Sequence, residues 1–559
     1  MKHLTRFLPA FVLPFILCAS EPQDMDNKLS RFIAEHVKEI QPLHIEGGRA
    51  QWRASTTGNK EDYERMEEIE LQVRRILSDR EAFAQLKRWR ESDGVRAPRL
   101  RRQLDRLYYA YLENQIDPAL MKRIVALSTD ITERFNTFQI HLDGKEVTLN
   151  DLNDVLRAST DSVQREAAWR ASKQVGPTIA GDLAQLARLR NEGARALGFA
   201  NFHTMCLLTG EQDPAELDRI FAELEALTRE PFAALKAELD RALTARYKIA
   251  PADLRPWHYH DPFFQNAPLV MGEDLDEYYK DHDIRALAEK FYAGIGLPVT
   301  DVLARSDLYE RPKKDPHAFS TDIDREGDVR VLCNLRNNAK WMETLLHELG
   351  HAVYSKGHDR GEPYILRVPA HSFATEGVAM FFGRLGSNAA WMQAMLGLPD
   401  EARAAIEKSQ HTNDRLQQLI FARWALVMFH FEKQLYANPD QNLDTLWWQL
   451  VARHQLLTPP ADPPAGVWAA KPHFTIAPCY YHNYMLGELF ASQVHNHLVH
   501  KVLGRESDAG VSYAGRKEVG EFLREKVFGP GAVHPWNEMI ARATGEPLTA
   551  KYFVAQFVK

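Results

Sequence analysis

Apolar residues recur every three or four positions over much of the chain between residues 27 and 249. The segments 61–89 and 213–243 show this spacing clearly, with charged residues at the positions between, and such a pattern predicts amphipathic α-helices. Asp213 and Pro214, at the head of the second segment, form the N-cap and first-turn proline with which many helices begin. This part of the chain is therefore predicted to be helical.

The pattern changes in two places. Prolines and aromatic residues interrupt it between residues 250 and 268, which predicts a loop or a short irregular segment. Residues 318–323 and 329–335 have strand character and flank the glycine-containing turn 324–328, so they predict a β-hairpin. No other region has strand character, and helical periodicity resumes after the hairpin. The predicted fold class is mainly α, with one small antiparallel β hairpin.

The composition is that of a large soluble globular protein. Of the 559 residues, 45% are hydrophobic and 26% are charged, which is sufficient for a large core. No Pro/Gly/Ser-rich linker, low-complexity tract or internal repeat marks a domain boundary, so we predict a single large unit. The 69 basic and 76 acidic residues are interleaved and give a net charge of -7. A chain without a basic patch is not expected to bind nucleic acid.

The N-terminus has the composition of a secretory signal peptide. Lys2 and Arg6 precede an apolar run, and two small residues then lead into a polar stretch. We therefore expect residues 1–20 to be a signal peptide and the protein to be exported, either periplasmic or secreted. A lipid anchor at Cys18 is an alternative, disfavoured because no small residue stands just before this cysteine. No later segment is apolar for the roughly 18 residues that a membrane span needs.

A helix with a metal-binding pattern follows the hairpin. Residues 337–338 offer an N-cap, an apolar face follows, and Gly357 supplies a C-terminal stop. His347 and His351 are one helical turn apart, so their rings project the same way and can both bind one Zn²⁺. Glu348 stands beside them, where it can accept a proton from the attacking water without being a ligand itself. This His-Glu-x-x-His motif predicts a zinc site.

The third ligand must come from elsewhere in the chain. Tyr354 and Gly357 exclude the metzincin arrangement, in which a glycine and a third histidine occupy these two positions. Glu376 lies 25 residues beyond the second histidine and opens a predicted helix that runs to about residue 385. A glutamate on a following helix is a common third zinc ligand, so we expect Glu376 to complete the set. The rivals lie in the polar turn and loop between the two helices: Asp359, Glu362 and His371.

Further motifs resemble the angiotensin-converting-enzyme family of zinc peptidyl-dipeptidases, which are gluzincins. His317 and Ala318 begin 30 residues before the zinc motif and match the His-Ala dipeptide on the strand that holds the substrate backbone in that family. Residues 470–495 resemble the family's Ala-Lys-x-His segment followed by Tyr-x-x-Tyr. Segments 168–202 and 446–455 agree in character. The resemblance covers nearly all of residues 21 to 559 and is that of a bacterial-type, single-domain member.

This resemblance implies a fold and a set of roles. The fold would be a large helical ellipsoid with a deep substrate cleft, formed by a catalytic domain over residues 21–559. Tyr484 and His473 would donate hydrogen bonds to the oxyanion of the tetrahedral intermediate. Lys471 and Tyr481 would hold the C-terminal carboxylate of the peptide, with help from Gln265.

Pattern and resemblance together predict a zinc-dependent metallopeptidase with one Zn²⁺ per chain. It would hydrolyse short peptides, releasing C-terminal dipeptides by Glu-assisted attack of water. The alternatives among enzymes are a thimet-like endo-oligopeptidase and a zinc carboxypeptidase. An exported peptide-binding receptor is the alternative outside enzymes. Glu348 and Tyr484 argue against a receptor, because binding alone requires neither a general base nor an oxyanion donor.

The chain also departs from the family pattern. The family places an aspartate one turn after the glutamate ligand to orient a ligand histidine, but here that position is Met380, so another acceptor must do this. Asn483 replaces the arginine that precedes the second tyrosine in chloride-activated members, and we expect weak or absent chloride activation. The spacing from the second histidine to Glu376 is one residue longer than usual, as in thimet-type oligopeptidases, which leaves the cleavage position open.

Overall fold

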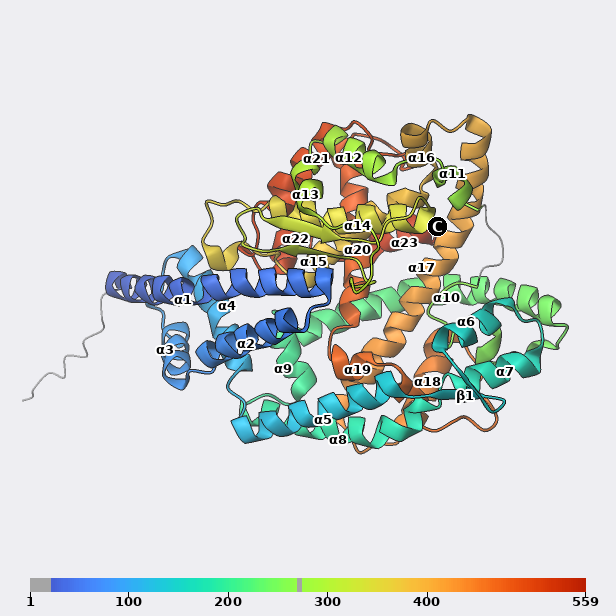
Figure 1. Cartoon of the computed structure of the whole chain (residues 1–559), viewed down its shortest axis with the longest axis horizontal. Coiled ribbons are helices and arrows are strands. Elements are labelled where there is room, and N and C mark those ends of the chain that lie inside the picture. Colours follow the sequence, from blue (N-terminus) through green and yellow to red (C-terminus); the bar gives the residue numbers. More distant parts are fainter. Residues whose placement is uncertain (1–21, 269–273, 559) are drawn as a thin grey trace, which may run out of the picture.

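Helices make up 69% of the structure, which confirms the mainly α prediction. The computed structural model describes residues 22–268 and 274–558 (Figure 1). The expected signal peptide and Cys18 lie outside these residues. The helices before the zinc motif are α1 (Pro22–Thr57), α2 (Lys60–Leu77), α3 (Arg80–Glu91), α4 (Pro98–Glu113), α5 (Pro118–Thr137), α6 (Leu149–Ala158), α7 (Ser162–Ala171), α8 (Val175–Ala196), α9 (Phe202–Thr209), α10 (Pro214–Tyr247), α11 (Asp276–Tyr279), α12 (Ile284–Gly294) and α13 (Thr300–Arg305).

The zinc motif lies on α14, and helices continue to the C-terminus. They are α14 (Ala339–Lys356), α15 (Ser372–Gly383), α16 (Ala389–Leu396), α17 (Asp400–Ala437), α18 (Leu443–Gln455), α19 (His473–Ile476), α20 (His482–His497), α21 (Lys517–Phe522), α22 (Trp536–Thr544) and α23 (Lys551–Phe557). Short 3₁₀ or π segments are η1 (Pro251–Asp253), η2 (Pro256–His258), η3 (Tyr364–Leu366), η4 (Arg384–Ser387), η5 (Val467–Ala470), η6 (Leu498–Val502) and η7 (Leu523–Phe528).

Side-chain caps set several helix boundaries. The segment 61–89 forms two helices, α2 and α3, because the Asp79 side chain accepts hydrogen bonds from the main-chain N–H groups of Glu81 and Ala82, at 2.8 and 2.9 Å, and so starts a new helix. The segment 213–243 is one helix, α10, capped by Asp213 as predicted. The irregular stretch 250–268 contains η1 and η2.

The structure contains the predicted hairpin and a second one. β3 (Phe319–Asp322) pairs antiparallel with β4 (Val329–Leu332), in a register that places Phe319 opposite Leu332. β1 (Ile140–Leu142) pairs with β2 (Lys145–Val147) in a separate two-stranded sheet. The expectation of a single strand region was therefore wrong. Strands of three residues are too short to show alternation, although the turn Asp143-Gly144, with φ of 52° and 75°, is a strong hairpin signal.

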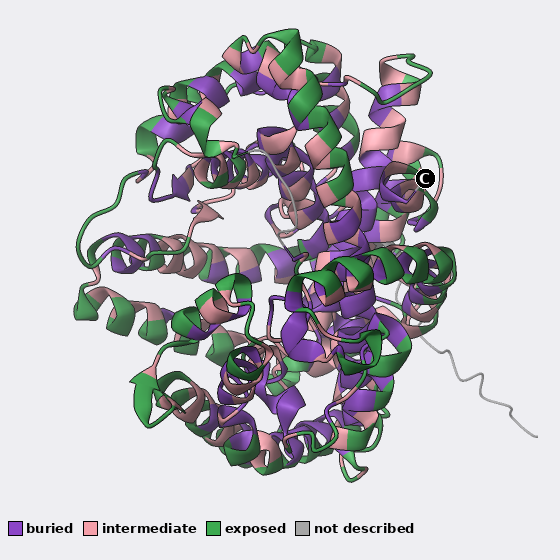
Figure 2. Cartoon of the chain, turned by 90° about the vertical axis from the view of Figure 1, so that its right-hand side faces the viewer, coloured by how far each residue is buried: buried purple, intermediate pink, exposed green. Residues whose placement is uncertain are grey.

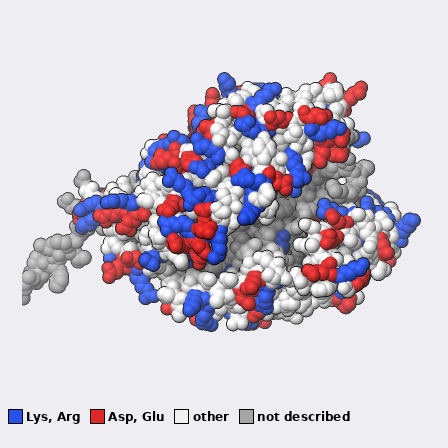
Figure 3. Space-filling view, in the orientation of Figure 1, with Lys and Arg blue, Asp and Glu red and all other residues white. Residues whose placement is uncertain are grey.

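Two large hydrophobic cores meet along the longest helix. One core gathers around α12–α16 and α20–α23, and the other around α5–α8 and α18. α17 contributes Ala425 and Phe429 to the first core and Trp424 and Val427 to the second, so it joins them into one body. Figure 2 shows buried residues concentrated where the long helices pass through the molecule. Figure 3 shows acidic and basic side chains interleaved and the surface hollowed between the upper and lower halves.

Candidate active site

Two histidines and a glutamate converge where α14 packs on α15. The Nε2 atom of His347 lies 3.6 Å from Oε1 of Glu376, and Nε2 of His351 lies 3.6 Å from Oε2. All three ligand atoms lie within 4.8 Å of one another. Donors about 2.1 Å from a tetrahedral Zn²⁺ would be about 3.4 Å apart, so this arrangement fits the ion and leaves one corner free.

The protonation states also fit a metal. Burial lowers the pKa of His347 to about 4. Burial and then the neighbouring His347 ring lower the pKa of His351 to about 3. Both imidazoles are therefore neutral at physiological pH, which is the form that binds metal ions. Their ring planes make an angle of 82°, and each ring presents Nε2 to Glu376.

Close helix packing fixes the positions of these ligands. A Cβ atom on Gly350 of α14 would lie 2.8 Å from Cα of Ala379 on α15. A Cβ atom on Gly377 of α15 would lie 2.7 Å from the carbonyl oxygen of Gly487 on α20. Only glycine allows the helix backbones to approach this closely. The three helices therefore hold the histidines and the glutamate at a set separation.

Glu376, and not Asp359, Glu362 or His371, lies beside the two histidines. α15 begins four residues before Glu376, so this carboxylate lies in the second turn rather than at the expected helix start. His371 is the N-cap of α15 and accepts a hydrogen bond from the main chain at 3.2 Å. Glu362 pairs with Arg99 at 2.6 Å, and Asp359 is exposed. Among the candidates, Glu376 is the one in the metal-binding group.

Thr375 can orient the His351 ring, a role that Met380, which has no carboxylate, cannot perform. Its Oγ1 lies 2.9 Å from Nδ1 of His351, so it can accept a hydrogen bond from Nδ1–H and leave Nε2 free for the metal. Thr375 was not identified from the sequence. The residue lies next to Glu376 in the sequence, but only helix packing shows that it reaches His351.

Replacing Thr375 with valine is expected to weaken zinc binding. Loss of such a partner typically lowers metal affinity by about 10- to 100-fold. The rate of zinc loss to a chelator measures this. Thr344→Val on α14 is the matched control, because its hydroxyl donates its hydrogen bond to the main-chain oxygen of Lys340 in the same helix. Equal zinc affinity in Thr375→Val and the wild type would contradict the role of Thr375.

Glu348 is a buried carboxyl group beside the metal-binding group. The residue is 7% exposed. Burial, followed by the nearby Glu376 carboxylate, raises its pKa to about 8, while a hydrogen bond from the main chain of Ser320 acts in the opposite direction. Burial also raises the pKa of Glu376 to about 7. A bound cation favours the ionised form of both groups, so Glu348 can exchange a proton near neutral pH.

Two tyrosines, Tyr480 and Tyr484, lie near the Glu376 carboxylate. Burial and then the Glu376 carboxylate raise the pKa of Tyr484. The rings of Tyr484 and His473 lie 6.4 Å apart. Burial and then the Glu376 carboxylate also raise the pKa of Tyr480. This tyrosine was not identified from the sequence. The two predicted oxyanion donors, Tyr484 and His473, therefore lie beside each other, and Tyr484 is close enough to Glu376 for the carboxylate to raise its pKa.

Lys471 is enclosed by aromatic rings. Its Nζ atom donates a 2.7 Å hydrogen bond to Oε1 of Gln265 and lies 5.2 to 5.6 Å from the ring centres of Phe263, Trp424 and Tyr481. The Trp424 indole donates a 2.7 Å hydrogen bond to the Tyr481 hydroxyl. The structure thus brings together Gln265, Lys471 and Tyr481, the three residues predicted to hold the substrate carboxylate. Trp424 orients one of them and was missed in the sequence.

A cavity of about 850 Å³ adjoins Lys471 and Gln265. Its walls include Phe263, Asn266 and residues of β1 and β2, so the β1–β2 hairpin, which was not predicted from the sequence, borders this part of the molecule. The cavity provides room for peptide residues on the side of the site where the carboxylate would bind.

His317 and Ala318 lie just before β3. The His317 side chain is 89% exposed and lies 3.2 Å from Asp315, while Ala318 packs against the first core. In the described residues, β3 pairs only with β4. Because the main-chain N–H of Ser320 reaches Glu348, the other edge of β3 faces the site. An extended peptide can pair with such an edge.

The helical fold and the His-His-Glu group beside a buried carboxyl group define a zinc metallopeptidase of the glutamate-ligand type. The family model for angiotensin-converting enzyme matches residues 23–558, which is nearly the whole chain. The chain therefore belongs to the angiotensin-converting enzyme family and is a zinc peptidyl-dipeptidase that acts on peptides. A search of curated proteins found no match.

Proposed function

We propose that this enzyme releases dipeptides from short peptides by binding their free C-terminal carboxylate to Lys471. The supporting observation is the environment of Lys471, which is buried, has a neutral hydrogen-bond partner in Gln265 and makes no ion pair with a carboxylate of the described residues. Burial lowers the pKa of Lys471, while the charge of Asp261 favours the protonated form and so acts to raise this pKa, but Asp261 forms no ion pair with Lys471 among the described residues. A buried cation is stabilised by a directly bonded anion, and the substrate carboxylate supplies one.

The chain's own residues can perform the proton transfers. Zn²⁺, when bound by the three ligands, polarises a carbonyl group and lowers the pKa of water. Glu348 takes a proton from the attacking water onto its carboxylate and later delivers a proton to the leaving amine. Tyr484 and His473 donate hydrogen bonds to the negative oxygen that develops, each contributing about 3 kcal/mol. His473 donates as a neutral imidazole, because burial and then the Lys471 charge lower its pKa to about 4.

Product analysis of one defined decapeptide tests the cleavage position. We expect the first products to be the C-terminal dipeptide and the corresponding octapeptide, and mass spectrometry distinguishes them from single residues and internal fragments. The same decapeptide with a C-terminal amide is the control and should react far more slowly. Release of single residues would indicate a carboxypeptidase. Internal fragments, for which the cavity beyond Lys471 has room, would indicate a thimet-like endo-oligopeptidase.

The pH dependence of kcat/KM is expected to show the titration of Lys471. Burial lowers the pKa of Lys471 to about 8. The lysine is therefore charged below pH 8 and neutral above it, so its attraction for a carboxylate is lost as the pH rises. We expect kcat/KM for a free-carboxylate peptide, divided by that for its amide, to fall as the pH passes about 8. A ratio that stays constant from pH 6 to 10 would argue against this lysine as the carboxylate-binding group.

We also propose that the enzyme is exported after removal of residues 1–20, which leaves residues 21–559 as the catalytic domain. The order of basic, apolar and small residues supports this, and the family match begins at residue 23. No helix of the described residues is long and apolar enough to cross a membrane. Determining the N-terminal residue of the mature protein by mass spectrometry tests the proposal, since an N-terminus at Met1 would contradict it.

A further inference from the structure

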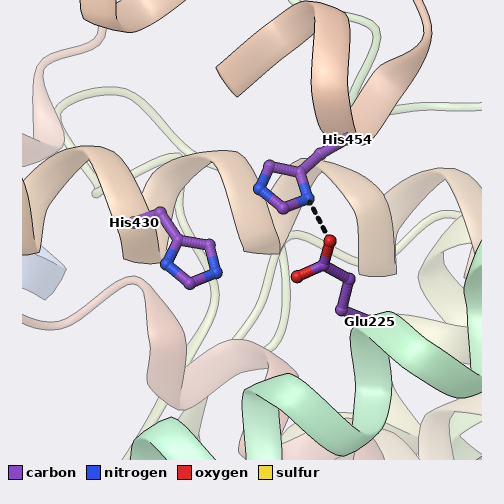
Figure 4. Close-up of side chains that lie close together, drawn as sticks. All are labelled: Glu225, His430 and His454. Carbon is purple, nitrogen blue, oxygen red and sulfur yellow. Dashed lines mark ion pairs between the residues drawn. The ribbon is translucent and has the colours of Figure 1, made fainter. Parts of the chain in front are cut away.

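A second group of two histidines and a glutamate lies in the other core. Glu225 comes from α10, His430 from α17 and His454 from α18. One ligand atom of each lies within 4.8 Å of the other two, and Nδ1 of His454 is 3.8 Å from Oε1 of Glu225. Figure 4 shows the two rings side by side, each with a nitrogen toward the Glu225 carboxylate.

His454 is buried without hydrogen-bond partners. The residue is 0% exposed, and neither ring nitrogen has a partner among the described residues. Nε2 of His430 also has none. An unsatisfied buried polar group destabilises a fold, so such a group in a native protein requires an explanation. Burial and then the His430 ring lower the pKa of His454 to about 3, so this imidazole is neutral and can act as a ligand.

Arg423 links the three helices by hydrogen bonds from its buried side chain. From α17 it donates a 2.7 Å hydrogen bond to the main-chain oxygen of His454 on α18. It donates a second, at 3.4 Å, to the main-chain oxygen of Glu225 on α10. His430 lies seven residues after Arg423, on the same face of α17. The backbone positions of all three candidate ligands are therefore fixed by one buried side chain.

We propose that Glu225, His430 and His454 bind a second divalent ion. Two neutral imidazoles and one carboxylate suit a borderline transition ion such as Zn²⁺ or Co²⁺. The ion would supply a partner to one buried nitrogen of each ring and cross-link α10, α17 and α18. Its role would be structural, because the group lies in the second core and shares no residue with the catalytic group.

Two arginines compete with the ion for Glu225. Arg229 and Arg453 reach its Oε1 atom at 3.1 and 3.0 Å. Their side chains are 63% and 61% exposed, so both can turn into solvent and release the carboxylate. We therefore expect the second ion to bind more weakly than the catalytic zinc. Arg453→Gln, which removes one competitor, should bind it more tightly than the wild type does.

Metal titration of the full chain tests the second site separately from the first. The starting protein is the double variant His347→Ala/His351→Ala, which lacks the catalytic histidines, so the result does not depend on the proposed peptidase function. Isothermal titration with Zn²⁺ and the visible absorption of Co²⁺ should show one ion per chain. Adding His454→Gln should abolish this binding. Adding His411→Gln, an exposed histidine on α17, should not change it.

Two results would overturn the proposal. The first is that the double variant binds no ion. The second is that the double variant still binds one ion per chain after His454→Gln is added. If the His454→Gln protein does not fold, Glu225→Gln and His430→Gln in the same background provide the test. Each should lower the Co²⁺ affinity by about tenfold or more, and the Zn²⁺-induced rise in melting temperature should disappear. Unchanged affinity in both variants would also overturn it.

Discussion

Glu348→Gln is expected to keep its zinc and lose its peptidase activity. The side chain keeps its size, and His347, His351 and Glu376 remain to bind the metal. The amide cannot accept a proton from water at neutral pH, and a positioned general base contributes roughly 10²- to 10⁴-fold to rate. We expect kcat to fall by this factor, with KM nearly unchanged. Metal content by mass spectrometry and steady-state kinetics on one peptide provide the measurement.

The metal content is the essential control for Glu348→Gln. A variant that loses both zinc and activity would show only that the site had been disrupted. A variant that holds one zinc per chain and still cleaves peptides at the wild-type rate would refute the role of Glu348. His347→Ala should give the complementary result, with loss of zinc and activity together.

Local sequence signals predicted the elements that carry the zinc motif. Asn338 caps α14 by accepting a hydrogen bond from the main-chain N–H of Trp341 at 2.9 Å, and Gly357 follows the last residue of the helix. Both signals act within one helical turn, so they are visible in the sequence. The hairpin β3–β4 was predictable for the same reason. The spacing of His347 and His351 is also local, because one helical turn brings both onto one face.

Contacts between distant segments could not be predicted in this way. The sequence places Thr375 and His351 on different helices, and nothing in either segment indicates which atoms meet. Trp424 bonds Tyr481 across 57 residues, and Glu225 and His454 lie still farther apart along the chain. These contacts depend on the packing of long helices. The β1–β2 hairpin was missed for another reason, since its strands are too short to produce a recognisable pattern.

Lys471→Met should separate peptides with a free C-terminus from amidated ones. The change removes the cation and keeps much of the apolar stem, so the contacts with Trp424 and Tyr481 are largely preserved. A free carboxylate would then be buried without a counter-charge, which costs about 3–5 kcal/mol. We expect kcat/KM for the free peptide to fall by about 10²- to 10⁴-fold. The amidated peptide, which never had this ion pair, should lose less than about tenfold.

The ratio of the two kcat/KM values is the diagnostic quantity for Lys471→Met. A general loss of folding or of zinc would lower both values together and leave the ratio unchanged, so an equal fall would show that Lys471 does not bind the terminus. Lys280→Met, which changes an exposed lysine, should alter neither value. An endo-oligopeptidase would show a small effect on both substrates, because its substrates need not end at this lysine. A large change in the ratio would therefore support both the binding of the carboxylate and the release of C-terminal dipeptides.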